Sequence, residues 1–384
     1  MMKRREFGQK LATAAIGASV AGASAASAQG SRTPRTNTLM HLGGDYHSVA
    51  GPRITSRDNL EYNLRYGVKH LTVQARNRSE GGGWDLDALK SMKDSCDQNR
   101  VQLEAIRMEP SYITLPKGAD RDREIDFIIG NIQKASEVGV KILTYHWTVI
   151  PIRRNRETSG RGRVTYSGFK LEDNWKDLPV GKSGKVSSED YWERITYFLE
   201  RVIPAAKQHG VRLACHPYDP PGLPFGYQGA DNWDSPSIFD SIKRYESIVD
   251  SPYNGFQLCL GTTAEGLKNP ATGVLPIVQY LGERGKIYQI HCATSVGAST
   301  VLRKCIPTKE RWTSSRSCEF FETPSSPVRS VPITCRIIQT ILEACSRLRS
   351  GMATSRPSFK RLIPKCGDDT SAWSCSVPKA ACQV

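Results

Sequence analysis

Short apolar runs alternate with amphipathic helical segments from about residue 39 to residue 291. Seven runs have the length and apolar character of buried strands, at 39–42, 68–73, 101–106, 141–146, 211–216, 255–260 and 286–291. The segments between them carry apolar side chains three and four residues apart, which predicts helices at 58–65, 85–98, 121–138, 188–209, 236–249 and 274–281. Two helices run into a glycine and then a strand, at Gly139 and Gly210, as a helix C-cap before a parallel strand does.

This repeated strand–helix order predicts an α/β fold with a parallel sheet. Seven units within about 250 residues favour a (β/α)₈ TIM barrel over an open sheet. The eighth strand and helix have no counterpart in the pattern, so we expect them to be missing or scrambled. No glycine-rich phosphate loop follows an early strand, which disfavours a dinucleotide-binding fold.

Side chains suited to metal binding stand at or next to the ends of three consecutive predicted strands: His216, Cys259 and His291. Catalytic side chains of such barrels lie at the carboxyl ends of the strands, so we expect these three to lie close together. Imidazole and thiolate suit Fe²⁺, Mn²⁺ or Zn²⁺ better than Ca²⁺ or Mg²⁺. Taken singly, a buried cysteine or histidine is more often a core residue, so the prediction of a metal site depends on their joint occurrence.

Three further polar residues belong to the same predicted face of the barrel. Glu104 and His146 are assigned to the ends of earlier strands, and Asp219 follows His216 in a proline-rich loop. The prolines stiffen that loop, and a carboxylate in it is placed to orient a metal ligand or a substrate hydroxyl. We therefore predict that Glu104, His146 and Asp219 contribute to a substrate-binding site.

Together these motifs resemble the mannonate dehydratase family. The matching stretches are His-Pro-Tyr-Asp-Pro-Pro from His216, Cys-Leu-Gly-Thr from Cys259 and Tyr-Gln-Ile-His ending at His291. The loop 160–166, which ends in Tyr166, is similar to the family's insertion after the fourth strand. The resemblance covers about 39–291 and implies a barrel of the xylose-isomerase-like type that holds Mn²⁺ or Fe²⁺. It implies His216, Cys259 and His291 as metal ligands and adds Tyr166 to the substrate-binding residues.

The family's reaction is the dehydration of D-mannonate to 2-keto-3-deoxy-D-gluconate in glucuronate catabolism. The proton beside the carboxylate is poorly acidic, so a metal that chelates the carboxylate and a hydroxyl would stabilise the enediolate. A base removes the C2 proton and an acid assists loss of the C3 hydroxyl. The resemblance implies a fourth ligand, an aspartate, followed directly by a histidine for the acid–base work. Neither is visible in this chain, so its catalytic residues stay unknown.

The tail, residues 292–384, departs from everything before it. It holds eight of the eleven cysteines, none of the seven histidines and 15 serines. It also carries 14 basic and 6 acidic side chains, and so contributes +8 to the net charge of +15. Two explanations fit this composition: a disulfide-linked module, for which an even number of cysteines is permissive, or a frameshift after residue 291.

Codon degeneracy favours the frameshift. Where the family continues with Phe-Arg-Asn-Ile-Arg-Gly-Gly, residues 292–299 read Cys-Ala-Thr-Ser-Val-Gly-Ala-Ser. The codons TGC GCA ACA TCC GTG GGG GCT TCC encode that stretch, and reading them from the third base gives Arg-Asn-Ile-Arg-Gly-Gly-Phe. The codons CCG ATC ACN for 332–334 contain GAT CAC, which encodes the missing Asp-His pair in the same shifted frame. We therefore expect the chain as encoded to be practically inactive.

The first 28 residues predict an export signal. The pair Arg4 and Arg5, the apolar run 11–23 and the small-residue motif Ala-Ser-Ala at 26–28 are typical of a twin-arginine signal peptide. We expect residues 29–38 to be a linker and the mature protein to be periplasmic or exported. A cytoplasmic location is expected if the signal is not functional.

Composition limits the remaining classes. With 39% hydrophobic and 24% charged residues the chain is globular, and no apolar run beyond the N-terminus reaches the ~18 residues of a membrane span. No basic face with interleaved aromatic residues argues for nucleic-acid binding. The family resemblance implies a small-molecule sugar acid as the partner, with a homo-oligomer left open. Two rival functions remain: a sugar isomerase or epimerase on the same barrel, and an exported non-catalytic protein with a cysteine-rich binding tail.

Overall fold

The computed structural model describes residues 41–44, 55–75, 79, 81–109, 111–150, 154–159, 165–219, 221–231, 237–292, 295–298, 301–304 and 334–337. All of them belong to one compact unit, Asn37–Val384. The export signal expected at 1–28 and the linker at 29–38 lie outside the described residues and stay predictions. None of the described helices is both long and apolar enough to cross a membrane.

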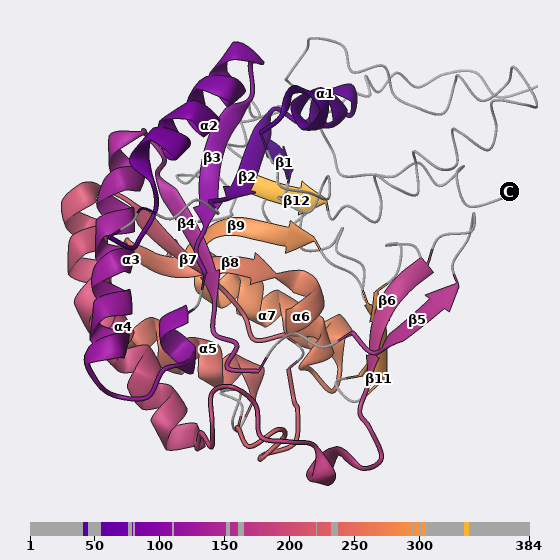
Figure 1. The fold of residues 1–384 in the computed structure, drawn as a ribbon. Coiled ribbons are helices and arrows are strands. Elements are labelled where there is room, and N and C mark those ends of the chain that lie inside the picture. The colour runs from indigo at the N-terminus through magenta and orange to yellow at the C-terminus, as the bar shows by residue number, and fades with distance from the viewer. Residues whose placement is uncertain are drawn as a thin grey trace, which may run out of the picture. The chain divides into compact units, whose positions relative to one another are not determined.

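Eight parallel strands close into a barrel, in the order β1-β12-β9-β8-β7-β4-β3-β2 around it (Figure 1). Their bounds are β1 His41–Gly44, β2 His70–Gln74, β3 Gln102–Arg107, β4 Ile142–His146, β7 Arg212–His216, β8 Asn254–Cys259, β9 Ile287–Cys292 and β12 Thr334–Ile337. The first seven in chain order are the predicted strands, each within two residues of its predicted bounds. The predicted α/β barrel is therefore confirmed.

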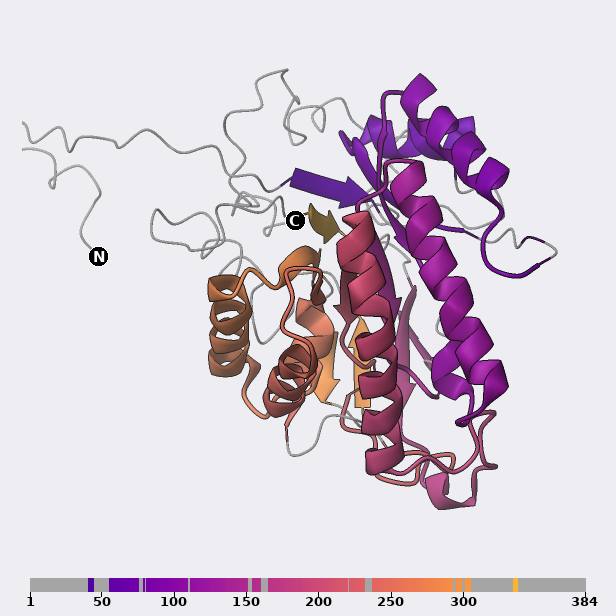
Figure 2. The same cartoon turned by 90° about the vertical axis from the view of Figure 1, so that its left-hand side faces the viewer.

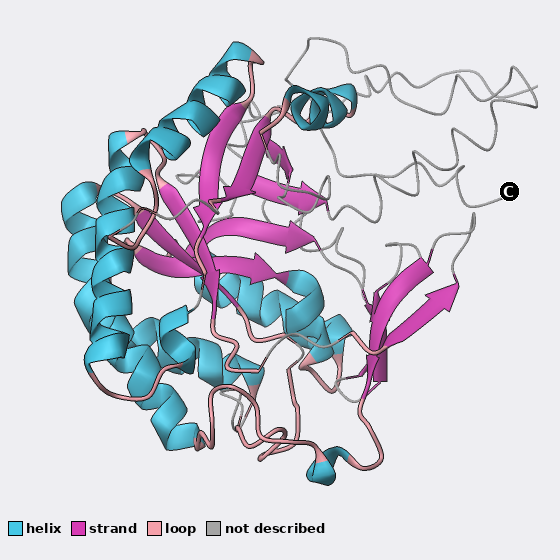
Figure 3. Ribbon diagram, in the orientation of Figure 1, coloured by secondary structure: helices cyan, strands magenta, loops and turns pink. Residues whose placement is uncertain are grey.

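Helices cover the outside of the barrel, as the views in Figures 2 and 3 show. They are α1 Arg57–Arg65, α2 Leu86–Gln98, α3 Ala119–Glu137, α4 Ser188–His209, α5 Ile238–Ile248, α6 Leu260–Glu265 and α7 Pro270–Glu283, with 3₁₀ turns at Ser111–Thr114 and Trp175–Asp177. The short helix α6 was not predicted, because its six residues directly follow β8 and carry no helical period of their own.

Helix α4 shows how the sequence sets an element. A capping box begins it: the Ser187 side chain accepts a hydrogen bond from the Asp190 backbone N–H, and the Asp190 carboxylate accepts one from the Ser187 backbone. Such a cap stabilises a helix by ~1 kcal/mol. Gly210 ends the helix in the left-handed conformation, with φ of 64°, before the chain enters β7. The buried face of α4 includes Phe198 and Leu199, which pack against the barrel.

A segment of the tail supplies the eighth strand, which corrects the expectation that this strand would be missing. β12 pairs in parallel with β9, from Thr334 beside Gln289 to Ile337 beside Cys292, and pairs with β1 on its other side. The edges of β9 and β1 each present backbone N–H and C=O groups that an extended segment can satisfy. Threonine and isoleucine favour a strand, and Pro332 precedes it, where proline does not break the ladder. No helix is described after β12, so the eighth unit is incomplete within the described ranges.

A smaller antiparallel sheet follows the carboxyl ends of two barrel strands. Its order is β10-β11-β6-β5, with bounds β5 Arg156–Ser159, β6 Thr165–Lys170, β10 Ser295–Ala298 and β11 Val301–Lys304. The insertion after β4 thus forms one hairpin and the start of the tail forms the other, joined through β6 and β11. The tail as far as residue 304 is therefore partly ordered into the fold, although its composition carried no such signal.

A polar layer crosses the barrel interior below its carboxyl ends. The side-chain amide of Gln257 donates to Gln289 at 3.0 Å, and that of Gln289 donates to the Thr72 hydroxyl at 3.4 Å. All three side chains are buried. Because buried polar groups cost free energy unless they are paired, this chain of bonds fixes β8, β9 and β2 relative to one another.

Gly255 in β8 lies close to the backbone of Lys286 and to the side chain of Tyr288. An added Cβ there would lie 2.6 Å from the Lys286 carbonyl oxygen and 2.6 Å from the Tyr288 ring. We expect Gly255→Ala to lower the free energy of unfolding by ~1–3 kcal/mol, because the well-packed barrel cannot take the extra methyl group. Gly130→Ala in α3, with nothing within 4 Å of the new Cβ, is the matched control and should gain ~0.5–1 kcal/mol. Urea unfolding measures both, and equal stabilities would contradict the packing described.

Candidate metal centre

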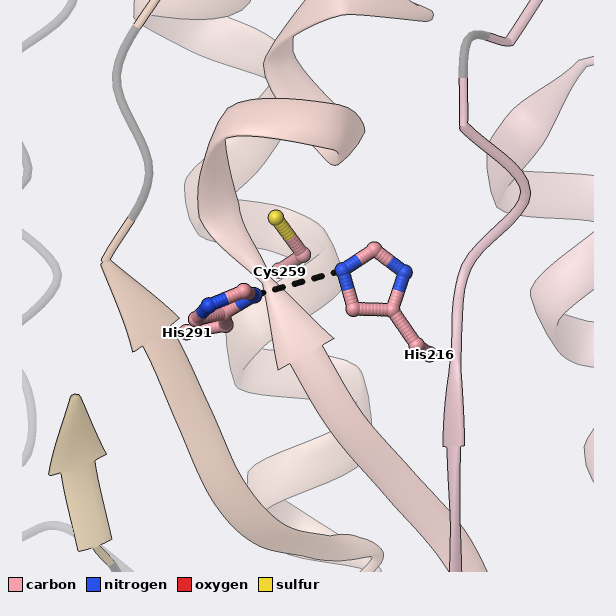
Figure 4. Close-up of side chains that lie close together, drawn as sticks. All are labelled: His216, Cys259 and His291. Carbon is pink, nitrogen blue, oxygen red and sulfur yellow. Dashed lines mark hydrogen bonds between the residues drawn. The ribbon is translucent and has the colours of Figure 1, made fainter. Parts of the chain in front are cut away.

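Figure 4 shows three side chains that converge at the carboxyl ends of β7, β8 and β9: His216, Cys259 and His291. One ligand atom of each lies within 4.8 Å of those of the other two. His216 and Cys259 are the last residues of β7 and β8, and His291 is the last but one of β9, in register with Cys259. The structure therefore gathers the three residues that the sequence placed at strand ends, and we call this group the candidate metal centre.

Hydrogen bonds orient the two imidazoles. His216 Nδ1 lies 2.6 Å from the carbonyl oxygen of Pro217, so this nitrogen is the donor. That bond leaves Nε2 of His216 with its lone pair directed at the centre, 3.3 Å from Nδ1 of His291. A metal ion held by His291 Nδ1 would require the tautomer of His291 in which Nε2 carries the proton. A backbone carbonyl that holds the far nitrogen of a histidine is the usual support of a metal ligand.

Cys259 joins the strand to the next helix. Its side chain is buried and caps α6, where Sγ accepts a hydrogen bond from the Thr262 backbone N–H at 3.4 Å. The Thr263 hydroxyl donates to the Cys259 carbonyl oxygen at 2.8 Å, which fixes the turn. A thiolate at this position is stabilised by the N–H bond it accepts. Two imidazoles and one thiolate that converge within this distance fit a transition-metal ion such as Fe²⁺, Mn²⁺ or Zn²⁺.

His146 ends β4 on the same side of the barrel. Burial lowers its pKa well below the usual 6.5, and Arg107 and His216 lower it further, whereas Asp219 raises it. The imidazole is therefore neutral at physiological pH. Its Nδ1 is buried and has no hydrogen-bond partner among the residues that the structure describes. A neutral ring with an open nitrogen suits a contact with a substrate hydroxyl, which keeps His146 among the predicted substrate-binding residues.

Asp219 is held by an ion pair. Both of its carboxylate oxygens lie near Nη2 of Arg154, at 2.9 and 3.1 Å, and its side chain is largely buried. Arg154 belongs to the insertion just before β5, so the pair ties that insertion to the loop after β7. In this structure Asp219 therefore contacts the insertion that follows β4. Its role in orienting a metal ligand or a substrate hydroxyl stays a prediction.

Glu104 was placed incorrectly by the sequence. It lies three residues before the end of β3, and its Oε1 is 3.2 Å from His41 Nε2 at the start of β1. The predicted strand ended one residue early, and the residue at the true end is Arg107, which the sequence analysis missed. An arginine directly after an apolar strand run was the available signal. Tyr166 lies in β6 of the smaller sheet, but its side chain is outside the described part, so its role stays a prediction.

The comparison with known proteins agrees with this centre. The family model of D-mannonate dehydratase (UxuA) matches residues 173–297, which include His216, Cys259 and His291. The chain is 26% identical to the mannonate dehydratase of Thermotoga petrophila, over 59% of this chain and 74% of that protein. It is 25% identical to the mannonate dehydratase of Shouchella clausii, over 57% and 68%. The chain is homologous to the mannonate dehydratases.

Solved structures show the fold that this mannonate dehydratase homologue shares. The crystal structure of mannonate dehydratase from Streptococcus suis serotype 2 aligns with a TM-score of 0.62, over 85% of this chain and 98% of that one, at 17% identity. A D-psicose 3-epimerase crystallised in the presence of D-fructose aligns with a TM-score of 0.51 at 10% identity, over 81% and 98%. The predicted fold class, an α/β barrel, is confirmed.

The eighth strand does not bring the carboxylate and histidine that the family resemblance requires. β12 reads Thr-Cys-Arg-Ile, with neither an acid nor an imidazole in its four residues. Arg336 has the register position beside His291. A cationic residue stands where the strand passes the level of the candidate metal centre, and a cation is not a metal ligand.

Proposed function

We propose that this chain, read beyond residue 291 in the frame of its relatives, is a metal-dependent hydro-lyase that dehydrates D-mannonate to 2-keto-3-deoxy-D-gluconate. The observation that carries the proposal is the convergence of His216, Cys259 and His291 in a homologue of the mannonate dehydratases. These three residues would hold Mn²⁺ or Fe²⁺. When bound, such an ion supplies a Lewis acid that stabilises negative charge on the substrate carboxylate and the enediolate.

The protein groups around the centre suit a sugar acid. Arg107 and His216 both act electrostatically on His146, so the three groups share one region of the barrel's carboxyl end. A guanidinium binds a carboxylate through two parallel hydrogen bonds, which gives Arg107 the role of holding the acid end of the substrate. Neutral His146 is placed to bind a hydroxyl of the same molecule. The Arg154–Asp219 ion pair keeps the insertion over the loop that follows His216.

The reaction needs one base and one acid. The base takes the C2 proton, the C3–O bond breaks, and the hydroxide leaves as water after it gains a proton from the acid. The resulting enol then becomes the 2-keto acid by moving its proton to C3. In the shifted frame, codons 332–334, which overlap the first residue of β12, encode the Asp-His pair that we propose for this work. In the described part of the encoded chain, β12 contains neither an aspartate nor a histidine.

Mass spectrometry of the product tests the reaction class. A frame-restored protein loaded with Mn²⁺ and given D-mannonate is expected to form a 2-keto acid that is lighter than the substrate by one water. Its sequence up to residue 291 is unchanged, so the candidate metal centre and the part of the barrel up to His291 are those described here. A product with the mass of the substrate would instead support an isomerase or epimerase. An absence of any product, with metal bound, would support a non-catalytic protein.

A further inference from the structure

A second cluster of metal-ligating side chains lies at the opposite end of the barrel from the candidate metal centre. His41 is the first residue of β1, His70 is the first of β2, and Glu104 is the third of β3. One ligand atom of each lies within 4.8 Å of those of the other two. The strands are parallel, so these positions are near the amino-terminal ends, whereas the candidate metal centre is at the carboxyl ends.

The contacts within this cluster leave little freedom. His41 Nε2 lies 3.2 Å from Glu104 Oε1, and the rings of His41 and His70 are in contact, with centroids 3.6 Å apart and planes tilted by 34°. The Glu104 side chain is only 12% exposed, so its charge is largely removed from water and requires a nearby cation. One divalent cation bound by all three side chains balances the carboxylate and uses both ring nitrogens.

A cavity gives a cation access to this cluster. It has a volume of about 460 Å³ and is lined by Glu104 together with Gln102, Lys141 and Arg212. Space beside Glu104 leaves an open position for a water ligand and an entry path, two features that a metal site needs. Lys141 and Arg212 line the same cavity and are positively charged, so they repel a metal ion. The ion therefore has to be held by direct bonds to its ligand atoms.

The cluster also spans the weakest part of the barrel closure. β1 has two residue pairs in register with β2, whereas β2 has five with β3. On its other side β1 pairs with β12, which has only four residues. A link from His41 to His70 and Glu104 would hold the first residue of β1 to its neighbour β2 and to β3, the strand beyond β2. Residues at the amino-terminal face of such barrels usually contribute to stability rather than to catalysis.

We propose that His41, His70 and Glu104 form a second divalent-metal site, suited to Zn²⁺, that cross-links β1, β2 and β3. Two imidazoles and one carboxylate, with a position left for water, form a donor set that zinc uses in proteins. This site is independent of the candidate metal centre and of the dehydratase reaction. It is expected to bind Zn²⁺ even when Cys259 is replaced.

Zinc binding by full-length variants tests this site. Accessible thiols are first alkylated, because the chain's eleven cysteines would also bind Zn²⁺. After equilibrium dialysis, Glu104→Gln and His70→Ala are each expected to hold one zinc fewer per chain than His209→Ala. His209 lies in the last turn of α4, outside both clusters, and is the matched control. Zn²⁺ is also expected to raise the unfolding temperature of the control and not that of the two variants.

The proposal would be overturned if Glu104→Gln held as much zinc per chain as the control His209→Ala. Glu104→Gln keeps the size and shape of the side chain, so it decides the question if His70→Ala does not fold. Circular dichroism without metal shows whether each variant has kept its fold.

Discussion

Restoring the shifted frame after codon 291 is expected to raise the rate of D-mannonate dehydration at least ~10²–10⁴-fold over that of the chain as encoded, because the encoded chain lacks a positioned general base. β12 closes the encoded barrel, but it reads Thr-Cys-Arg-Ile and sets Arg336 at the register position of His291. The missing carboxylate ligand weakens metal binding as well. Formation of 2-keto-3-deoxygluconate with added Mn²⁺ measures the rate of both versions.

The control for this comparison is a frame-restored chain in which the new aspartate and histidine are replaced by asparagine and glutamine. It keeps the restored strand and helix but loses the ligand and the base, so we expect a rate close to that of the encoded chain. Equal turnover by the encoded and restored chains would refute both the frameshift and the role given to the Asp-His pair.

Replacing Cys259 by serine in the frame-restored protein is expected to remove metal and activity together. Changes even to the groups that support metal ligands typically cost 10–100-fold in affinity or activity, and loss of a ligand should cost at least ~100-fold. Cys96→Ser is the matched control, since Cys96 is buried in α2 and burial raises its pKa to about 12, which keeps it a neutral thiol. Elemental analysis and turnover measured on the same samples check the prediction. Full metal content in Cys259→Ser would show that Cys259 is a core residue.

The barrel was predictable because its signals are local. Each strand such as β4 or β7 is a short apolar run between helices with a period of 3.6, and tertiary packing follows that pattern. The candidate metal centre was predictable for a related reason: parallel strands bring their carboxyl ends to one side, so His216, Cys259 and His291 had to be neighbours once the strands were assigned.

What the sequence analysis missed depends on contacts between distant segments or on single-residue boundaries. The pairing of β6 with β11 joins residues 165–170 to 301–304, and no local pattern announces it. β12 forms because open edges on β9 and β1 recruit it. A boundary error of one residue in β3 hid Arg107, and Glu104, the third residue of β3, was assigned to the carboxyl end although it lies near the amino-terminal end. His41 and His70 were overlooked because chemistry was sought only at the carboxyl ends of strands.

The most direct measurement is an anomalous difference map, recorded at the manganese absorption edge, from crystals of the frame-restored protein grown with Mn²⁺. We expect His216, Cys259 and His291 to bind the metal ion. The map should then show a manganese peak bounded by the two imidazoles and the Cys259 sulfur, and no peak there in crystals of Cys259→Ser. A manganese peak elsewhere in the barrel, with these three side chains in contact only with one another, would contradict it.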